Sequence, residues 1–177
     1  MNPDSYQEML AAVQAFHHKH RFRETGGEEM TYRVALMAEE LGRAAFPCPL
    51  LGTINATYVL AACGGGGQSA LGEIAEGRSA SMAITNQAGS WSPGDTDVTC
   101  VDGKLQGTAW YVQDARKADR LLVSAHTPAG LGLYWVATNA PGITISPDTI
   151  VDLTRDQAHI SFDQVVAEEV SANGLAA

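Results

Sequence analysis

The chain of 177 residues contains 45% hydrophobic and 18% charged residues, an ordinary composition for a globular protein of one domain or slightly more. Its formal net charge of −9 disfavours nucleic acid and anionic membrane surfaces as partners. No apolar run approaches the roughly 20 residues that a membrane-spanning helix needs, and the polar start does not resemble a signal peptide. Three widely spaced cysteines suit a reducing compartment, so we expect a cytoplasmic protein.

An N-terminal helix is predicted over residues 6–16, where apolar residues recur at helical spacing. His17 and His20 follow about one turn apart, which is a spacing that metal ligands can use. No carboxylate or cysteine stands at a matching position, so we interpret this segment as a solvated helix end and predict no metal site.

A second helix is predicted over residues 28–45, and the prolines that follow it end it because proline cannot continue the backbone ladder. The segment 26–42 resembles the MazG-type nucleotide pyrophosphohydrolases, which hold Mg²⁺ with a helical EExxE motif and a second acidic motif. Here Glu39 and Glu40 are followed by Arg43 where the third carboxylate should stand, and no second acidic motif follows. A hard divalent ion needs several converging carboxylate oxygens, so we do not expect this activity.

Four consecutive glycines, Gly64–Gly67, follow a short third helix predicted over residues 53–63. Glycine samples more backbone conformations than other residues, which makes this run the clearest candidate for a flexible linker. We therefore predict two parts, a shortened helical region over residues 1–67 and a β domain over residues 68–177.

Short segments rich in β-branched and aromatic residues follow, separated by turn dipeptides such as Asp102-Gly103 and Pro141-Gly142. This spacing predicts a mainly β, α+β fold with an antiparallel β-barrel of about seven or eight strands. The predicted strands are residues 78–86, 95–101, 104–112, 118–126, 130–138, 142–146 and 157–164.

Four segments stand in uninterrupted order between Ala80 and Glu169, namely SMAITN, LQGTAWYVQDARKADRLLVSA, LGLYWVATNAPGITI and DLTRDQAHISFDQVVAEE. Together they resemble the middle β-barrel domain of the acyl-CoA dehydrogenase family. Since that domain covers FAD and faces an acyl-CoA in the family, the resemblance implies a flavin-side surface here. It also implies that the helical N-terminal domain is shortened, and that the C-terminal helical domain with its glutamate base has no counterpart in this sequence.

The resemblance aligns the flavin-side motifs of the family with this sequence only in part. The TEP-type motif falls on residues 85–87, where the threonine is kept and the next two positions differ, and a Gly-Ser pair falls on residues 89–90. The motif aromatic–Ile/Val–Thr/Ser falls on residues 111–113, where Gln113 replaces the expected hydroxyl. We therefore expect no cofactor to be held by this chain alone, with FAD binding as the alternative.

Strand alternation places the side chains of Tyr111 and Gln113 on one face, and those of Trp110 and Val112 on the other. The resemblance turns the first face toward the cofactor site, near Thr85. A phenol and an amide at that place could polarise a carbonyl group without redox chemistry.

The preferred hypothesis is a cofactor-independent β-barrel enzyme that binds an apolar, polyketide- or acyl-type intermediate. It would catalyse a non-redox cyclisation or isomerisation by holding a reactive conformer in a dry pocket. One alternative is a non-catalytic, FAD-binding partner subunit of a heteromeric acyl-CoA dehydrogenase, and another is a pure binding or scaffold module. We expect a homodimer unless such a dehydrogenase chain is the partner.

Two sets of residues are assigned to this hypothesis. His126 is the histidine best placed for proton transfer, and the alternative is that it is only an exposed residue at the end of a strand. For the aromatic residues, the alternative to ligand binding is packing in the core. The predicted catalytic residues are Thr85, Tyr111, Gln113 and His126, and the predicted ligand-binding residues are Asn86, Ser90, Trp91, Trp110, Tyr134 and Trp135.

Overall fold

The computed structural model describes the backbone of residues 26–152 and 154–171, and the side chains of this part except those of residues 26–34 and 93. The helix predicted over residues 6–16 and the two histidines after it lie outside the described residues. The chain divides into two compact units between Pro47 and Cys48, ahead of the boundary predicted after Gly67. Among the described residues, no helix is long and apolar enough to cross a membrane.

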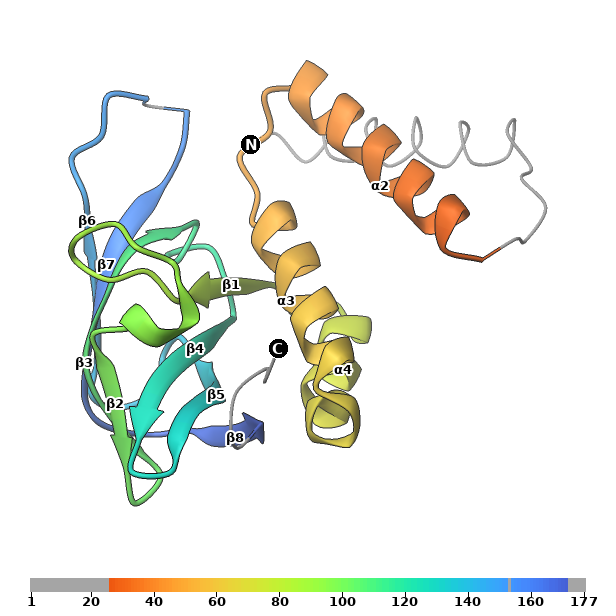
Figure 1. Cartoon of the computed structure of the whole chain (residues 1–177). Helices are drawn as coiled ribbons and strands as arrows, with labels where there is room; N and C mark the ends of the chain where they lie inside the picture. Colours follow the sequence, from red (N-terminus) through yellow and green to blue (C-terminus); the bar gives the residue numbers. More distant parts are fainter. Residues whose placement is uncertain (1–25, 153, 172–177) are drawn as a thin grey trace. The chain divides into compact units, whose positions relative to one another are not determined.

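The first unit contains helix α2 (Gly26–Arg43), which confirms the second predicted helix (Figure 1). Arg43, in its last turn, lies 3.4 Å from a carboxylate oxygen of Glu39 and 3.4 Å from one of Glu40. The two glutamates of the incomplete EExxE motif therefore form ion pairs on the helix surface.

The second unit begins with helix α3 (Leu50–Ala62), the 3-10 helix η1 (Gly64–Gly67) and helix α4 (Gln68–Ala75). Sequence reasoning found α3 but missed α4, because this segment was assigned to the start of the β domain. The strands that follow, interrupted by the 3-10 helix η2 (Pro93–Asp95), are β1 (Ala80–Ala83), β2 (Val98–Val101), β3 (Lys104–Gln113), β4 (Arg120–Thr127), β5 (Gly130–Ala137), β6 (Ile143–Pro147), β7 (Gln157–Val166) and β8 (Glu168–Ser171).

The eight strands form one sheet in the order β6-β7-β3-β2-β4-β5-β8, with β1 paired to β4 off this path. Most neighbouring strands are antiparallel, while β4 runs parallel to both β1 and β2. The α+β fold and the mainly antiparallel β domain are confirmed. The barrel is not closed, because the outer strands β6 and β8 are not paired with each other in the described part of the chain.

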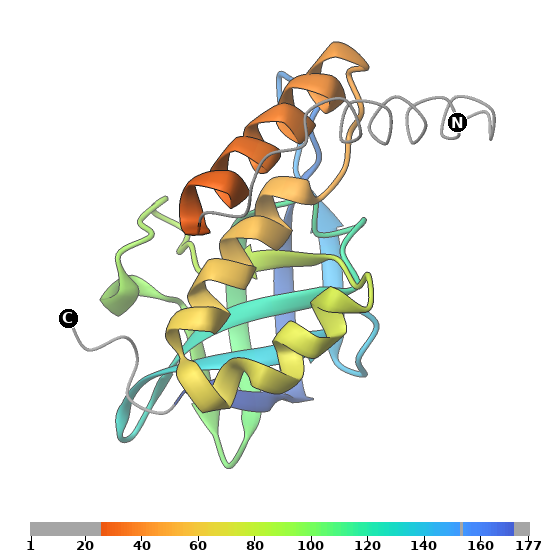
Figure 2. The ribbon, with the colours of Figure 1, turned by 90° about the vertical axis from the view of Figure 1, so that its right-hand side faces the viewer.

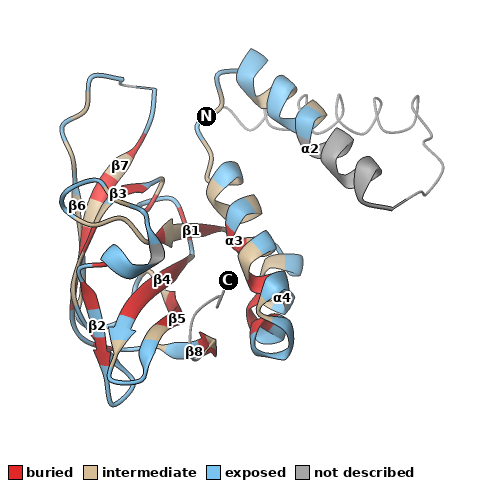
Figure 3. Cartoon of the chain, viewed as in Figure 1, coloured by how far each residue is buried: buried red, intermediate tan, exposed pale blue. Residues whose placement is uncertain are grey.

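Buried residues are spread over several strands of the sheet (Figure 3), and they fall into two separate clusters. One face encloses a core that includes Phe162. Helices α3 and α4 lie across the other face (Figure 2), where Leu60 of α3 packs in one cluster with Leu122 of β4. Because side chains alternate along a strand, Tyr134 and Trp135 on β5 belong to opposite clusters.

The glycine run, predicted to be a flexible linker, is a short helix packed into the second unit. A Cβ atom at Gly66 would lie 2.0 Å from the carbonyl oxygen of Val170, and one at Gly67 would lie 2.1 Å from that of Leu60. Atoms cannot approach so closely without a clash, so only glycine allows the backbones to touch here. The run therefore serves close packing between α3, α4 and β8.

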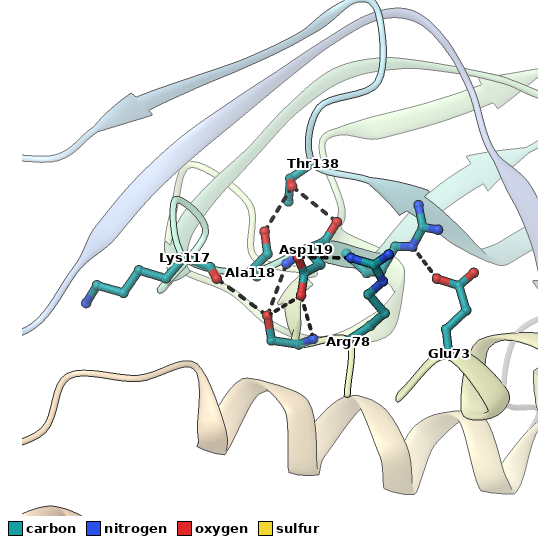
Figure 4. A network of polar contacts seen from close by, with 8 residues as sticks. Glu73, Arg78, Lys117, Ala118, Asp119 and Thr138 are labelled. Carbon is teal, nitrogen blue, oxygen red and sulfur yellow. Dashed lines mark hydrogen bonds and ion pairs between the residues drawn. The ribbon is translucent and has the colours of Figure 1, made fainter. Parts of the chain in front are cut away.

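A polar network joins the segment after α4 to the start of β4 (Figure 4). One carboxylate oxygen of Asp119 accepts hydrogen bonds from the backbone amide and the hydroxyl of Ser79, both at 2.9 Å, and Arg78 lies 3.8 Å from the other oxygen. Beside them, Arg120 Nε donates to Glu73 of α4. This half-buried ion pair connects α4 to the sheet.

Candidate functional site

Strand β3 carries a β-bulge where the predicted aromatic motif lies. The pairing of β3 with β7 shifts register between Ala109 and Val112, and Tyr111 has a positive φ of 56°. Ala109 and Val112 are both buried, and the two residues between them, Trp110 and Tyr111, both lie outside the core. The prediction that Trp110 and Tyr111 occupy opposite faces is wrong, because a period of two holds only for an unbroken ladder.

Trp110 and Tyr111 form what we call the aromatic face. Their ring centroids lie 6.4 Å apart at an interplanar angle of 45°, and Tyr111 is 42% exposed. Tyr111 Oη donates a hydrogen bond to the carbonyl oxygen of Gln87 at 3.0 Å. The backbone amide of Trp110 donates one to the carbonyl oxygen of Thr85 at 2.9 Å. These bonds tie the loop after β1 to the aromatic face and bring the predicted residues Thr85 and Tyr111 together.

The side chains of Asn86 and Ser90 shape the loop that follows β1. Asn86 Oδ1 accepts a hydrogen bond from the amide of Ser90 at 2.8 Å, and Ser90 Oγ donates to Asp95 Oδ2 at 2.5 Å. The next residue, Trp91, is 77% exposed. The two polar residues are thus engaged within the loop, while the indole ring of Trp91 remains available for contact with another molecule.

Sequence reasoning missed a histidine that contacts the aromatic face. His159 Nδ1 lies 2.8 Å from Asp148 Oδ1, and its ring stacks on that of Trp110 with centroids 5.2 Å apart at 27°. Gln157 Nε2 donates to the other oxygen of Asp148 at 3.2 Å. The contact of His159 with Asp148 was not predicted because it depends on the β6–β7 register, which pairs Ser146 with His159.

Four predicted residues do not join the aromatic face. His126 is exposed on β4, and Gln113 is exposed at the end of β3, where its carbonyl oxygen accepts a hydrogen bond from Ser81. Tyr134 is buried in the core enclosed by the sheet. Trp135 is buried beneath α3 and α4, and its Nε1 has no hydrogen-bond partner among the described residues.

The aromatic face suits the ring of a flavin better than its diphosphate. An exposed phenol offers a stacking surface, but the nearby cations of the turn after β3 are already paired. Arg116 Nε donates to Asp156 Oδ1 at 2.9 Å, and this hydrogen bond raises the pKa of Arg116. Lys117 Nζ lies 3.1 Å from Asp114 Oδ1. A flavin ring could therefore stack on Tyr111, while Asp156 and Asp114 would compete with phosphate groups for these two cations.

No family model matches the chain, and no curated protein sequence matches it. Among solved structures, the chain is similar to a variant of the Tcur3481-Tcur3483 steroid acyl-CoA dehydrogenase, with 26% identity, a TM-score of 0.64, and coverage of 77% of this chain and 39% of that chain. It is similar to the ChsE4-ChsE5 complex from Mycobacterium tuberculosis at 21% identity, with a TM-score of 0.62 and coverage of 78% and 39%. It is also similar to a glutaryl-CoA dehydrogenase from Mycobacterium smegmatis in complex with FADH2, at 20% identity, with a TM-score of 0.53 and coverage of 61% and 32%.

The chain therefore has the fold of the acyl-CoA dehydrogenase middle β domain together with adjoining helices, as the four segments predicted. It spans 39% of the length of the first two of these structures.

Proposed function

We propose that this chain is a subunit that supplies an aromatic wall to a flavin site completed by a second chain. The observation that carries the proposal is the exposure of its aromatic side chains, since Tyr111 is 42% and Trp91 is 77% exposed. Aromatic rings that gather on one exposed surface are typical of sites against which another molecule packs, and the hydrogen bond from Tyr111 to Gln87 holds the loop that carries Trp91 to the aromatic face. Because Arg116 and Lys117 are paired, the diphosphate of FAD would be held by the other chain.

The similar structures are in keeping with this proposal. They include a complex of two named proteins, ChsE4 and ChsE5, and an enzyme in complex with FADH2. A shared flavin site would explain why the aromatic face is kept while the residues around it depart from the family motif.

The test is a titration of the purified full chain with riboflavin and with FAD, in which binding is measured by the quenching of the flavin fluorescence. If only the ring is recognised, both ligands bind weakly and with affinities within about threefold of each other, since the diphosphate adds no contact. Tyr111→Ala should weaken both at least about fivefold, because stacking on an aromatic side chain contributes roughly 1–3 kcal/mol. Tyr58→Ala is the matched control, since Tyr58 is 58% exposed on α3 and outside the aromatic face.

Two outcomes would overturn the shared-site proposal. One is tight binding of FAD with much weaker binding of riboflavin, which would mean that this chain alone holds the diphosphate. The other is an equal loss of riboflavin binding in the Tyr111→Ala and Tyr58→Ala variants.

A second candidate function, a cofactor-independent enzyme, is favoured by the histidine at the aromatic face. Asp148 orients His159 through Nδ1, which leaves Nε2 for proton transfer next to Trp110. This arrangement suits a non-redox cyclisation or isomerisation of an apolar acyl- or polyketide-type intermediate. Gln113 lies away from this face, and Tyr111, whose hydroxyl donates to Gln87, would contribute its ring as a packing surface for that intermediate.

The enzyme hypothesis is tested by incubating the chain, without flavin, with a linear β-ketoacyl thioester and separating isomeric products by chromatography. His159→Gln should lower the rate about 100-fold or more, because general acid–base catalysis contributes at least that much. His126→Gln is the control and should leave the rate within about twofold. Equal losses in the two variants, or no product, would reject the hypothesis for this class of substrate.

A further inference from the structure

A cavity of about 260 Å³ lies at the end of the sheet where the β2–β3 and β4–β5 hairpins turn. Residues of both turns line it, together with Tyr134 of β5 and Glu169 of β8. Strand β3 begins beside the cavity at Lys104 and reaches the aromatic face near its other end, so the rise per residue separates the two places by roughly 20 Å. The cavity is therefore distinct from the aromatic face.

The floor of the cavity is a buried phenol. Tyr134 and its neighbour Cys100 are each 3% exposed, and both line the cavity. Gly132 leaves room for the phenol, since a Cβ atom there would lie 2.9 Å from Tyr134 Oη. Burial raises the pKa of Tyr134, and the hydrogen bond with Cys100 and the charge of Glu169 raise it further. The hydroxyl stays protonated, and because a thiol is a weak partner, a ligand oxygen would be a better acceptor.

The rim of the cavity is negatively charged. Glu169 stands opposite Tyr134 in the β5–β8 ladder. Asp102 is fixed at the tip of the β2–β3 hairpin, where it and Gly103 have positive φ values of 51° and 72°, as in a type I′ turn. None of the described residues that line the cavity is lysine, arginine or histidine. An anionic ligand would be repelled here, and an ammonium group would be attracted.

We propose that this cavity binds a small organic cation, an ammonium compound with a compact apolar body and an oxygen acceptor. The oxygen accepts a hydrogen bond from Tyr134 Oη, and the ammonium group lies between the carboxylates of Asp102 and Glu169. The apolar body packs on the turn residues Pro128 and Ala129. A volume of about 260 Å³ limits the ligand to roughly one ring, since larger ligands occupy larger pockets. The proposal is independent of the flavin and enzyme hypotheses.

Three compounds that share a phenyl ring and a hydroxyl but differ in charge test the proposal by isothermal titration of the full chain. They are 2-amino-1-phenylethanol, which is a cation, neutral 1-phenylethanol, and the anion mandelate. We expect the cation to bind at least about tenfold more tightly than the neutral alcohol, and mandelate to show no binding. Added salt should weaken the binding of the cation, because salt screens charges at an exposed rim.

Variants then distinguish direct contact of the ligand with a carboxylate in the cavity from attraction by the overall negative charge of the protein. Glu169→Gln should weaken the cation about tenfold, since a hydrogen bond to a charged group is lost. Glu168→Gln is the matched control and should change the affinity less than about twofold, because Glu168 is the preceding residue of β8 and does not line the cavity. Tyr134→Phe removes only the hydroxyl and should weaken the cation about fivefold, with circular dichroism as the check on folding.

Any of three results would overturn the proposal. The first is a similar affinity for all three compounds, which would mean that binding does not depend on the charge of the ligand. The second is an equal loss in the Glu168→Gln and Glu169→Gln variants, which would point to the overall field. The third is the absence of binding by the cation.

Discussion

The packing of the glycine run predicts that single alanine substitutions within it have opposite effects. At Gly65 an added Cβ would have no atom within 4 Å, whereas at Gly67 the Cβ would lie 2.1 Å from the carbonyl oxygen of Leu60. Gly66→Ala would meet the carbonyl oxygen of Val170 at 2.0 Å. The clashing atoms belong to the backbone, so they cannot be relieved by rotating a side chain.

The magnitude follows from the shift that each clash demands. Backbone atoms must move by about 1 Å in a close-packed region, and overpacking of this kind costs about 1–3 kcal/mol or more. Gly66→Ala and Gly67→Ala should therefore lower the unfolding free energy by about 3 kcal/mol and the Tm by about 10 °C. Gly65→Ala should be neutral or stabilise the protein by up to about 1 kcal/mol, because it restricts the unfolded chain.

Urea denaturation followed by circular dichroism and tryptophan fluorescence measures these differences, with Gly65→Ala as the control for loss of a glycine. Unfolding free energies within about 0.5 kcal/mol of the parent for Gly66→Ala and Gly67→Ala would refute the reasoning. That result would mean that the run is a flexible linker after all.

Two further predictions concern the polar network. Hydrogen bonds from Ser79 hold the pKa of Asp119 below its ordinary value. The ionised carboxylate therefore stabilises the fold at pH values above its unfolded pKa, and this stabilisation is lost as the pH falls through the folded pKa. Ser79→Ala should thus be destabilising near about pH 6, and the difference from the parent should shrink as the pH falls through the folded pKa of Asp119. Urea denaturation at several pH values measures this, and a constant difference would contradict it. Glu73→Gln should lower the free energy of unfolding by about 1–2 kcal/mol, because it removes the charged partner of the half-buried Arg120. Asp152→Asn, in the exposed pair with Arg155, is the control and should lower it by less than about 0.5 kcal/mol in the same measurement. Equal costs in these two variants would show that burial does not matter.

The strands and their turns could be predicted from sequence because both depend on local chemistry. Asp102-Gly103 marked a hairpin, and the positive φ values at both residues are those that such a dipeptide favours. Strands β3, β4 and β5 lie close to their predicted bounds, since alternation and β-branched content suffice to locate a strand.

The features that were missed depend on contacts between distant segments. The bulge at Trp110 and Tyr111 is set by pairing with β7, and it undid the predicted faces of β3. The contact of His159 with Asp148 needs the β6–β7 register, which no local pattern reveals. The glycine run looked flexible because its composition gives no sign of the carbonyl groups that pack against it.

The outer strands of the open sheet carry residues that oppose growth of the sheet by a foreign strand. Strand β6 ends in Pro147, which has no amide hydrogen to offer, and β8 begins with the adjacent acids Glu168 and Glu169. A strand added next to β6 would lack one backbone hydrogen bond at Pro147. A strand added next to β8 would have to bury the two carboxylates or place its own acidic residues beside them. Both borders of the open sheet are therefore poor templates for an added strand.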